Sequence, residues 1–270
     1  MNEMKVTTGQ LTLSAALFLS AALCAGPCHA QDSVERSLLE DSKLYFTAPL
    51  HWNQEHWAYF AGTVATIAVA HEFDATVRHA FEPTGGHQPL DGADPNSTRD
   101  AIPAVALLAG TWVIGAIRHD AGQRGEAWSM AEAAGFSAVD TFVLKYAAGR
   151  LRPNETTHVD SWFESGDSFP SMHTSVAFAV GTVLAESGDD EHRWARRLIG
   201  YGVAGATAYA RLHDNVHWFS DVVAGGAIGM ASARFVINRD AERAGTRHTA
   251  ISVVPLDRGV MLTWYLVPTP

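Results

Sequence analysis

The chain has 270 residues, of which 47% are hydrophobic and 18% charged, and its formal net charge at pH 7 is −10. This length allows one large hydrophobic core, and a mean hydropathy close to zero favours a well-buried globular domain over a chain made mostly of membrane spans. The acidic balance argues against a nucleic-acid partner, which would require a basic stripe, so any anionic substrate must be met by a local cluster of Lys and Arg.

The N-terminus is typical of an export signal. Lys5 lies in a short polar start, residues 11–23 are apolar, and residues 28–30 fit a cleavage site. We therefore expect residues 1–30 to be a signal peptide that directs the protein to the periplasm or to the envelope membrane surface; a buried first helix or a retained anchor is the alternative. Both cysteines lie inside this segment, so a mature chain would carry neither a disulfide nor a thiolate metal site.

The first part of the mature chain is predicted to be helical with one long loop. Residues 31–52 are polar and mixed, which indicates a short helix followed by a loop. The apolar stretch 57–70 predicts a single helix over 55–81. Residues 82–99 are rich in Pro, Gly and Asp and predict a surface loop, with a glycosylation sequon at Asn96.

Further helices are predicted in the second part of the chain. Gly225, Gly226 and Gly229 in the last of them would permit close approach to a neighbouring helix. Together with 55–81 they make about six core helices, which predicts an all-α bundle. The predicted segments are 100–118, with Pro103 in its first turn, 126–150, 170–186, 198–210 and a final helix ending near Ile237.

The C-terminal segment has a different pattern. Residues 248–254 and 260–267 are rich in β-branched and aromatic side chains and flank Asp257-Arg258-Gly259, which predicts a β-hairpin. A hairpin alone is marginally stable, so we expect it to pack on the bundle or to join a partner. We accordingly expect three parts, namely a signal peptide (1–30), a helical domain (31–245) and a hairpin extension (246–270).

The sequence leaves open whether the bundle crosses a membrane. The longest uncharged run, residues 101–117, only just reaches the lower limit for a span, and charged residues interrupt the other helices. Length and charge favour a soluble or membrane-surface bundle. An integral inner-membrane protein with its active site facing the periplasm is the alternative, and the oligomeric state stays undetermined.

The first block of candidate functional residues is the segment 145–153, Lys-Tyr-Ala-Ala-Gly-Arg-Leu-Arg-Pro. Lys145 and Arg152 are seven residues apart, so on a helix ended by Pro153 they would share a face. Two cations on one face repel each other unless an anion lies between them, which indicates an anion site. A solvated basic helix end that complements the helix dipole is the alternative, and we expect Arg150 to be such a residue.

The second block, residues 169–174, reads Phe-Pro-Ser-Met-His-Thr and opens a predicted helix. Free N–H groups in a first turn bind anions, and the Ser171 hydroxyl can add a donor. His173 would stand beside the bound group and titrate near neutrality, which suits proton transfer. Taken alone, His173 fits a capping or core histidine better than a catalytic one.

The third block lies in residues 210–229. Arg211 could grip a phosphate or a carboxylate. His217 and Asp221 are four residues apart, so on a helix Asp221 could hold one ring nitrogen of His217 and leave the other free to attack or to take a proton. The three blocks together supply cations, a hydroxyl, two histidines and a carboxylate, an inventory that suits phosphoryl transfer without a metal or another cofactor.

These blocks resemble the signature of the type 2 phosphatidic acid phosphatase (PAP2) superfamily, which also includes bacterial acid phosphatases and vanadium haloperoxidases. The family pattern is Lys, six residues, Arg-Pro; then Pro-Ser-Gly-His; then Ser-Arg, five residues, His, three residues, Asp. Every spacing is kept between Lys145 and Asp221. Met172 replaces the Gly, and we expect its side chain to narrow the pocket or to line a lipid-facing wall. Ala210 replaces the Ser, and neither change removes a catalytic group.

The resemblance implies a six-helix PAP2-type bundle and assigns a role to each matching residue. His217 would be the nucleophile that forms a phosphohistidine, Asp221 would orient its ring, and His173 would be the general acid and then the base. Vanadate is expected to occupy the phosphate site as a transition-state mimic, and no metal or cofactor is expected. The phosphate would be bound by Lys145, Arg152, Arg211, Ser171 and the backbone at Met172.

We therefore expect a metal-independent phosphatase that hydrolyses phosphoric monoesters or diphosphates. A phosphorylated lipid such as phosphatidate or undecaprenyl diphosphate is the favoured substrate, with possible association with a membrane surface. The alternatives are a small-molecule acid phosphatase, a vanadium-dependent haloperoxidase, whose chains are usually much longer, and a non-catalytic module that binds a phosphorylated envelope component. Retention of both histidines and the aspartate speaks against the last.

Overall fold

The computed structural model describes residues 28–81, 98–188, 192–243, 251–256 and 259–264. Nearly all of the expected signal peptide and the loop with the sequon at Asn96 lie outside the described residues.

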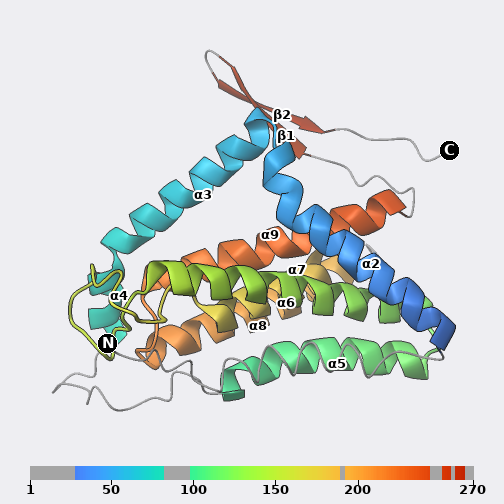
Figure 1. Ribbon diagram of the computed structural model, residues 1–270, viewed down its shortest axis with the longest axis horizontal. Coiled ribbons are helices and arrows are strands. Elements are labelled where there is room, and N and C mark those ends of the chain that lie inside the picture. The colour runs from blue at the N-terminus through green and yellow to red at the C-terminus, as the bar shows by residue number, and fades with distance from the viewer. Residues whose placement is uncertain (1–27, 82–97, 189–191, 244–250, 257–258, 265–270) are drawn as a thin grey trace.

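Helices make up most of the described chain, which confirms the predicted all-α class. Five of them, α5 to α9, run roughly side by side and form the bundle, while α2 and α3 diverge from their junction toward opposite ends of it (Figure 1). The α-helices are α2 (Cys28–Thr47), α3 (Gln54–Glu72), α4 (Asp74–Phe81), α5 (Ile102–Ile117), α6 (Ala121–Ala148), α7 (Met172–Glu186), α8 (Arg193–His213) and α9 (Phe219–Arg243), with short 3-10 turns η1 (Ala48–His51) and η2 (Thr98–Ala101).

The core of the bundle is centred on α7, which packs against α6, α8 and α9. Its side chains are mostly small, and most of its positions are buried. At Gly225 and Gly229 of α9, an added Cβ would fall on the main-chain oxygens of Ser171 and Ser175 in α7. The predicted close helix approach is thus confirmed at these two glycines, whereas a Cβ at Gly226 would only meet the Phe178 ring at an ordinary 3.5 Å.

Two predicted elements differ from the structure at the N-terminal side. The segment 31–52 is not a short helix and loop, because α2 is a 20-residue helix held to the bundle by its buried face. Its Tyr45 ring stacks on Phe136 with centroids 4.4 Å apart, and Asp41 lies 2.8 Å from Arg239 of α9. The mixed polar composition of this segment did not indicate a buried face, because only a few side chains of α2 contact the core.

The predicted helix over 55–81 is broken at Phe73 into α3 and α4. Phe73 caps α3, with its N–H bonded to the Ala70 carbonyl at 3.0 Å. The break turns Asp74 inward, where it is completely buried. Charged residues are normally expected at the surface, so the apolar pattern of the sequence could not reveal a break that turns Asp74 inward.

The outer helices α3 and α5 carry large apolar side chains that the protein leaves exposed. On α3 they include Trp57, Phe60 and Val69, and on α5 Ile102 and Ile117. Within the described residues, two segments are long and apolar enough to cross a membrane by length and composition, namely 99–117 and α9, and only 22% of the first is buried.

The C-terminal segment forms two paired strands, β1 (Ile251–Leu256) and β2 (Gly259–Trp264). They are antiparallel, with Ile251 opposite Trp264 and Leu256 opposite Gly259. Residues 257–258 between them lie outside the described part of the chain.

Candidate active site

The three predicted blocks come together at one end of the bundle. The first spans the end of α6 and the loop after it, the second lies at the start of α7, and the third runs from the end of α8 through the connecting loop into α9. Hydrogen bonds join them; for example, the Ser171 N–H donates to the Asp221 carbonyl at 3.0 Å, and an Arg152 Nη donates to the Val216 carbonyl at 2.9 Å. Blocks far apart in sequence thus form a single site.

His217 lies in the loop before α9 and is buried, with 3% of its surface exposed. Its Nδ1 is 3.4 Å from Oδ2 of Asp221, and its Nε2 is 3.3 Å from Nη1 of Arg152. The prediction that His217 and Asp221 share a helix face is wrong, because only Asp221 is helical. Asp221 instead reaches back from the first turn of α9 and accepts the Trp218 N–H at 2.9 Å, as the third residue of a helix does in a capping box.

The surroundings of His217 lower the pKa of its imidazole well below the usual value. Burial is the largest cause, because it disfavours the charged ring. The positive charges of Arg152, Lys145 and Arg211 act in the same direction, and so does His173. The ring is therefore neutral near pH 7, the form that can act as a nucleophile.

The first block is not one helix ended by Pro153. Gly149 ends α6 in the left-handed conformation, with φ of 54° and its N–H bonded to the Lys145 carbonyl at 3.0 Å. Glycine adopts this conformation without strain, so the helix stops before the proline. Lys145 therefore reaches the site from the helix, and Arg152 reaches it from the loop.

The three predicted phosphate-binding cations are all buried beside the two histidines. Arg152 donates Nε to the Asp167 carboxylate at 2.7 Å, and Lys145 donates Nζ to the Asp167 carbonyl and to that of Ser168. Arg211, in the last turn of α8, donates to Asp100 at 2.5 Å. Three buried basic side chains therefore surround one imidazole, two of them bound to carboxylates, and together they can attract an anion.

The second block begins α7 with Ser171 as its N-cap residue. Ser171 is buried, and its Oγ accepts the Thr174 hydroxyl at 3.0 Å. His173 lies in the first turn, close enough to His217 to lower its pKa. The Met172 side chain packs in the hydrophobic core and therefore does not line an outer, lipid-facing wall, since the helix start turns this position inward.

Sequence reasoning missed Arg150, which was expected on a solvated helix end and is instead completely buried. It donates to Asp221 at 2.7 Å and to Asp74 at 2.7 Å, and its guanidinium lies 4.4 Å from the Trp162 ring centroid and 5.2 Å from that of Trp218. The signal available in the sequence was weak. It consists of a third cation in the segment 145–153 and a carboxylate, Asp74, directly after an apolar stretch.

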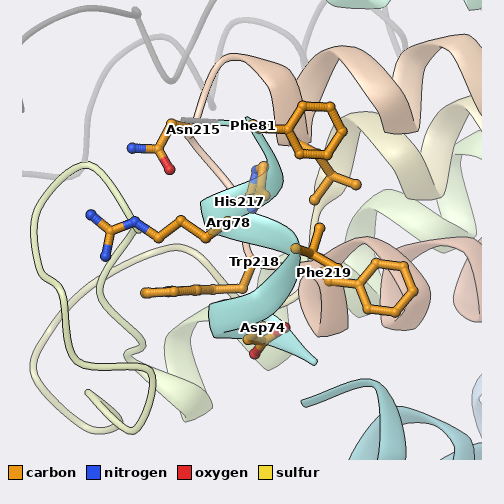
Figure 2. A pocket seen from close by; sticks show the side chains of 9 residues that line it. Asp74, Arg78, Phe81, Asn215, His217, Trp218 and Phe219 are labelled. Atoms are coloured by element: carbon orange, nitrogen blue, oxygen red, sulfur yellow. The ribbon is translucent and has the colours of Figure 1, made fainter. Parts of the chain in front are cut away.

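A small pocket lies beside His217 on the side of α4. Figure 2 shows the Arg78 side chain extending from α4 above the Trp218 ring, with Asn215 nearby. The Arg78 guanidinium is 5.6 Å from the Trp218 ring centroid, a cation–π distance. The pocket also contacts Asp74, so α4 lines one side of the surroundings of His217.

Comparison with known protein families confirms the resemblance seen in the sequence. Residues 126–243 match the model of the PAP2 superfamily. An 86-residue region is 38% identical to a lipid A 1-phosphatase of Porphyromonas gingivalis, covering 32% of this chain and 17% of that protein. A 112-residue region is 31% identical to a PA-phosphatase related-family protein of Dictyostelium discoideum, covering 36% and 41%. The chain thus spans less than half the length of each of these curated relatives.

Two solved structures resemble the chain at low overall similarity. One is the crystal structure of Aquifex aeolicus LpxE, with 21% identity over 52% of this chain and 82% of that one and a TM-score of 0.40. The other is described as the first transmembrane PAP2 type phosphatidylglycerolphosphate phosphatase from Bacillus subtilis, with 18% identity over 87% and 98% and a TM-score of 0.39.

Proposed function

Because residues 126–243 match the PAP2 superfamily and contain every predicted catalytic residue, we propose that the protein is a metal-independent phosphatase acting through a phosphohistidine at His217. One observation carries the proposal: a buried imidazole with a lowered pKa faces Arg152 with its Nε2 and lies among three buried cations. A neutral nucleophile inside a cationic pocket suits attack on a phosphate ester, because the cations neutralise the charge on the phosphoryl oxygens.

The reaction proceeds in two steps. In the first, Nε2 of His217 attacks phosphorus, the bond to the leaving oxygen breaks, and His173 gives its proton to that oxygen. In the second, His173 takes a proton from water, the water oxygen attacks phosphorus, and the phosphorus–nitrogen bond breaks to release phosphate and neutral His217. The proton stays on Nδ1 of His217 throughout, and Asp221, whose Oδ2 lies 3.4 Å from Nδ1, stabilises the charge that the ring gains on attack.

The phosphate oxygens are bound by side chains and by a helix start. Arg152 offers a planar fork and Arg211 a second, and each now donates to a carboxylate that an incoming phosphate would replace or share. Lys145 supplies a point charge, and the first N–H groups of α7, beginning at Met172, supply neutral donors. Vanadate, which forms a trigonal bipyramid, would bind the same groups as a mimic of the transition state.

We further propose that the substrate is a phosphorylated lipid and that the bundle is embedded in the envelope membrane. The exposed outer helices support this, since segment 99–117 is long and apolar enough to cross a membrane with only 22% of it buried, and the apolar part of α3, residues 57–70, is also largely exposed. A helix that is apolar all round and unburied needs lipid or protein around it. The lipid A 1-phosphatase and PA-phosphatase names of the relatives agree with a lipid substrate.

The test is phosphate release by the full chain in detergent, in EDTA, with and without vanadate. The panel contains phosphatidate, phosphatidylglycerol phosphate, lipid A, undecaprenyl diphosphate and a small soluble ester. We expect EDTA-resistant, vanadate-inhibited release from one of the lipids and none from a His217→Ala variant. Preference for the small ester would contradict the lipid assignment alone. Full turnover by His217→Ala would contradict the assignment of His217 as nucleophile, and no release by the wild type would contradict the phosphatase itself.

A further inference from the structure

The carboxylate that faces the nucleophile is itself held by a layer of buried groups. Oδ2 of Asp221 accepts the Ser168 hydroxyl at 2.5 Å and the Trp218 N–H at 2.9 Å, and it lies 3.4 Å from Nδ1 of His217. Oδ1 accepts Nη1 of Arg150 at 2.7 Å. The two carboxylate oxygens therefore bind different groups. Oδ2 faces the histidine, and Oδ1 is held by Arg150.

Arg150 reaches Asp221 as one arm of a fixed fork. Its Nη1 binds Asp221 and the Ser220 hydroxyl, and its Nη2 binds Asp74 at 2.7 Å and the Val159 carbonyl at 2.7 Å. The planar guanidinium lies against the rings of Trp162 and Trp218, which restrict its rotation. A planar group with both arms bound can hold a carboxylate in one orientation, which a single point charge cannot do.

Asp74 anchors the other arm from α4, and it is completely buried. One of its oxygens accepts the Ser220 N–H at 2.7 Å, and the other accepts the Ser220 hydroxyl at 2.7 Å in addition to Arg150. His71 lies 2.9 Å from the same carboxylate and 2.9 Å from Asp160 at the surface. The break between α3 and α4 thus places a second carboxylate behind the first.

We infer that Arg150 and Asp74 are positioning residues of the proposed reaction: Asp74 fixes the Arg150 guanidinium, and Arg150 fixes Asp221 so that Oδ2 faces Nδ1 of His217. The inference rests on the proposed function. Neither residue touches the phosphate, which is left to Lys145, Arg152 and Arg211. Loss of the pair should therefore slow formation of the phosphohistidine and leave binding of the phosphate group nearly intact.

The chain offers a matched control at the opposite end of α9. Glu132 binds Arg239 through both carboxylate oxygens, and this pair is also buried and joins α6 to α9. Asp74→Asn and Glu132→Gln each remove one charge from a buried carboxylate at nearly constant volume. They differ in one respect, because only Asp74 connects through its arginine to the nucleophile.

The experiment compares wild type, Asp74→Asn, Arg150→Lys and Glu132→Gln for lipid phosphate hydrolysis, rapid-quench phosphoenzyme formation and vanadate affinity. We expect kcat and the rate of phosphoenzyme formation to fall on the order of 10- to 100-fold in Asp74→Asn and Arg150→Lys, as for a nucleophile displaced by a fraction of an ångström. The KM and the vanadate affinity should change little in both. Glu132→Gln should lose thermal stability but keep its kcat.

The pH profile supplies a readout that a purely structural role would not move. Asp74→Asn leaves the Arg150 charge less compensated, so Asp221 stabilises protonated His217 less and the acidic limb of kcat/KM shifts to lower pH. Arg150→Gln removes the positive charge that compensates Asp221, so Asp221 stabilises protonated His217 more strongly and the limb shifts to higher pH. The other charged groups around the imidazole are the same in both variants; they are Lys145, Arg152, Arg211 and His173.

Equal kcat in Asp74→Asn and Glu132→Gln would overturn the inference while the proposed phosphatase stands, provided that His217→Ala is inactive in the same series. A loss confined to KM or to vanadate affinity would also overturn it, because it would make Arg150 a phosphate ligand. If Asp74→Asn fails to fold, Arg150→Lys provides the test, because it keeps the positive charge and loses the planar guanidinium. Its kcat and its vanadate affinity then decide. Wild-type turnover by His217→Ala would instead refute the proposed function.

Discussion

Replacing Gly225 by alanine should move the start of α7 away from α9 and so displace Ser171 and His173, which lie at that helix start. A Cβ at this position would fall on the Ser171 carbonyl oxygen, with the Ser175 nitrogen also within 3.3 Å. Ser171 caps α7, and its N–H holds the Asp221 carbonyl. The main chain on both sides is fixed by hydrogen bonds, so the clash cannot be relieved by rotating a side chain.

The expected magnitude follows from comparison with Gly226→Ala on the same helix. Both changes gain about 1 kcal/mol of helix propensity in α9. The new Cβ at residue 226 makes an ordinary 3.5 Å contact with Phe178, so this variant should keep the gain. At residue 225, overpacking costs about 1–3 kcal/mol. The two variants should therefore differ by about 1–3 kcal/mol, or about 2–12 °C in melting temperature for a chain of this size.

The assay is thermal unfolding of the two single variants and the wild type in one detergent, followed by phosphatase activity below the lowest transition. We expect Gly226→Ala to melt at or above the wild type with full activity. Gly225→Ala should melt below Gly226→Ala and should lose kcat, because Ser171 and His173 move with the helix start. Equal melting temperatures for the two variants, or full activity in Gly225→Ala, would refute the close-packing argument.

Three further predictions concern the site itself. His217→Gln should form no acid-labile phosphoenzyme in a rapid-quench assay, and a labelled intermediate in this variant would place the nucleophile elsewhere. Arg152→Lys should lower kcat/KM on the order of 10²- to 10³-fold, as removal of one transition-state donor does, and steady-state kinetics showing less than a tenfold loss would argue against direct contact with the phosphate. Because the pKa of His217 is lowered, its neutral form persists as the pH falls, and the acidic limb of kcat/KM should lie below pH 6.5. A pH–rate profile checks this, with titration of the substrate alone as the control. An acidic limb at pH 7 or above that the substrate does not explain would contradict the lowered pKa of the imidazole.

The sequence predicted which residues gather at one end of the bundle, and it did not predict the contacts that hold them there. The blocks around Lys145, His173 and His217 each lie at the end of an apolar stretch, so their assembly at one end of a bundle follows from the helix pattern. The details do not follow. His217 approaches Asp221 through a cap at the start of α9, because the carboxylate satisfies the Trp218 N–H in addition to facing the ring.

Arg150 and Asp74 show why the second layer of the site could not be predicted. The two residues are 76 positions apart, and nothing in the local pattern of either one indicates a buried partner. A cation next to a helix end is usually solvated, and a carboxylate that follows an apolar stretch usually marks a surface. Their burial depends on the break at Phe73, which carries neither Gly nor Pro as a signal.

The two buried ion networks described above lie at opposite ends of α9, so their separation can be compared with the thickness of a bilayer. Asp221 stands in the first turn of α9 and Arg239 near its last, so eighteen residues separate them, or about 27 Å along the helix. One charged residue, Arg234, lies between them. This distance is close to the roughly 30 Å of a bilayer's hydrocarbon core. In such a bilayer the catalytic histidine would stand at the headgroup level of one leaflet, where a lipid could present its phosphate with its acyl chains still in place, and the Glu132–Arg239 pair would mark the opposite leaflet.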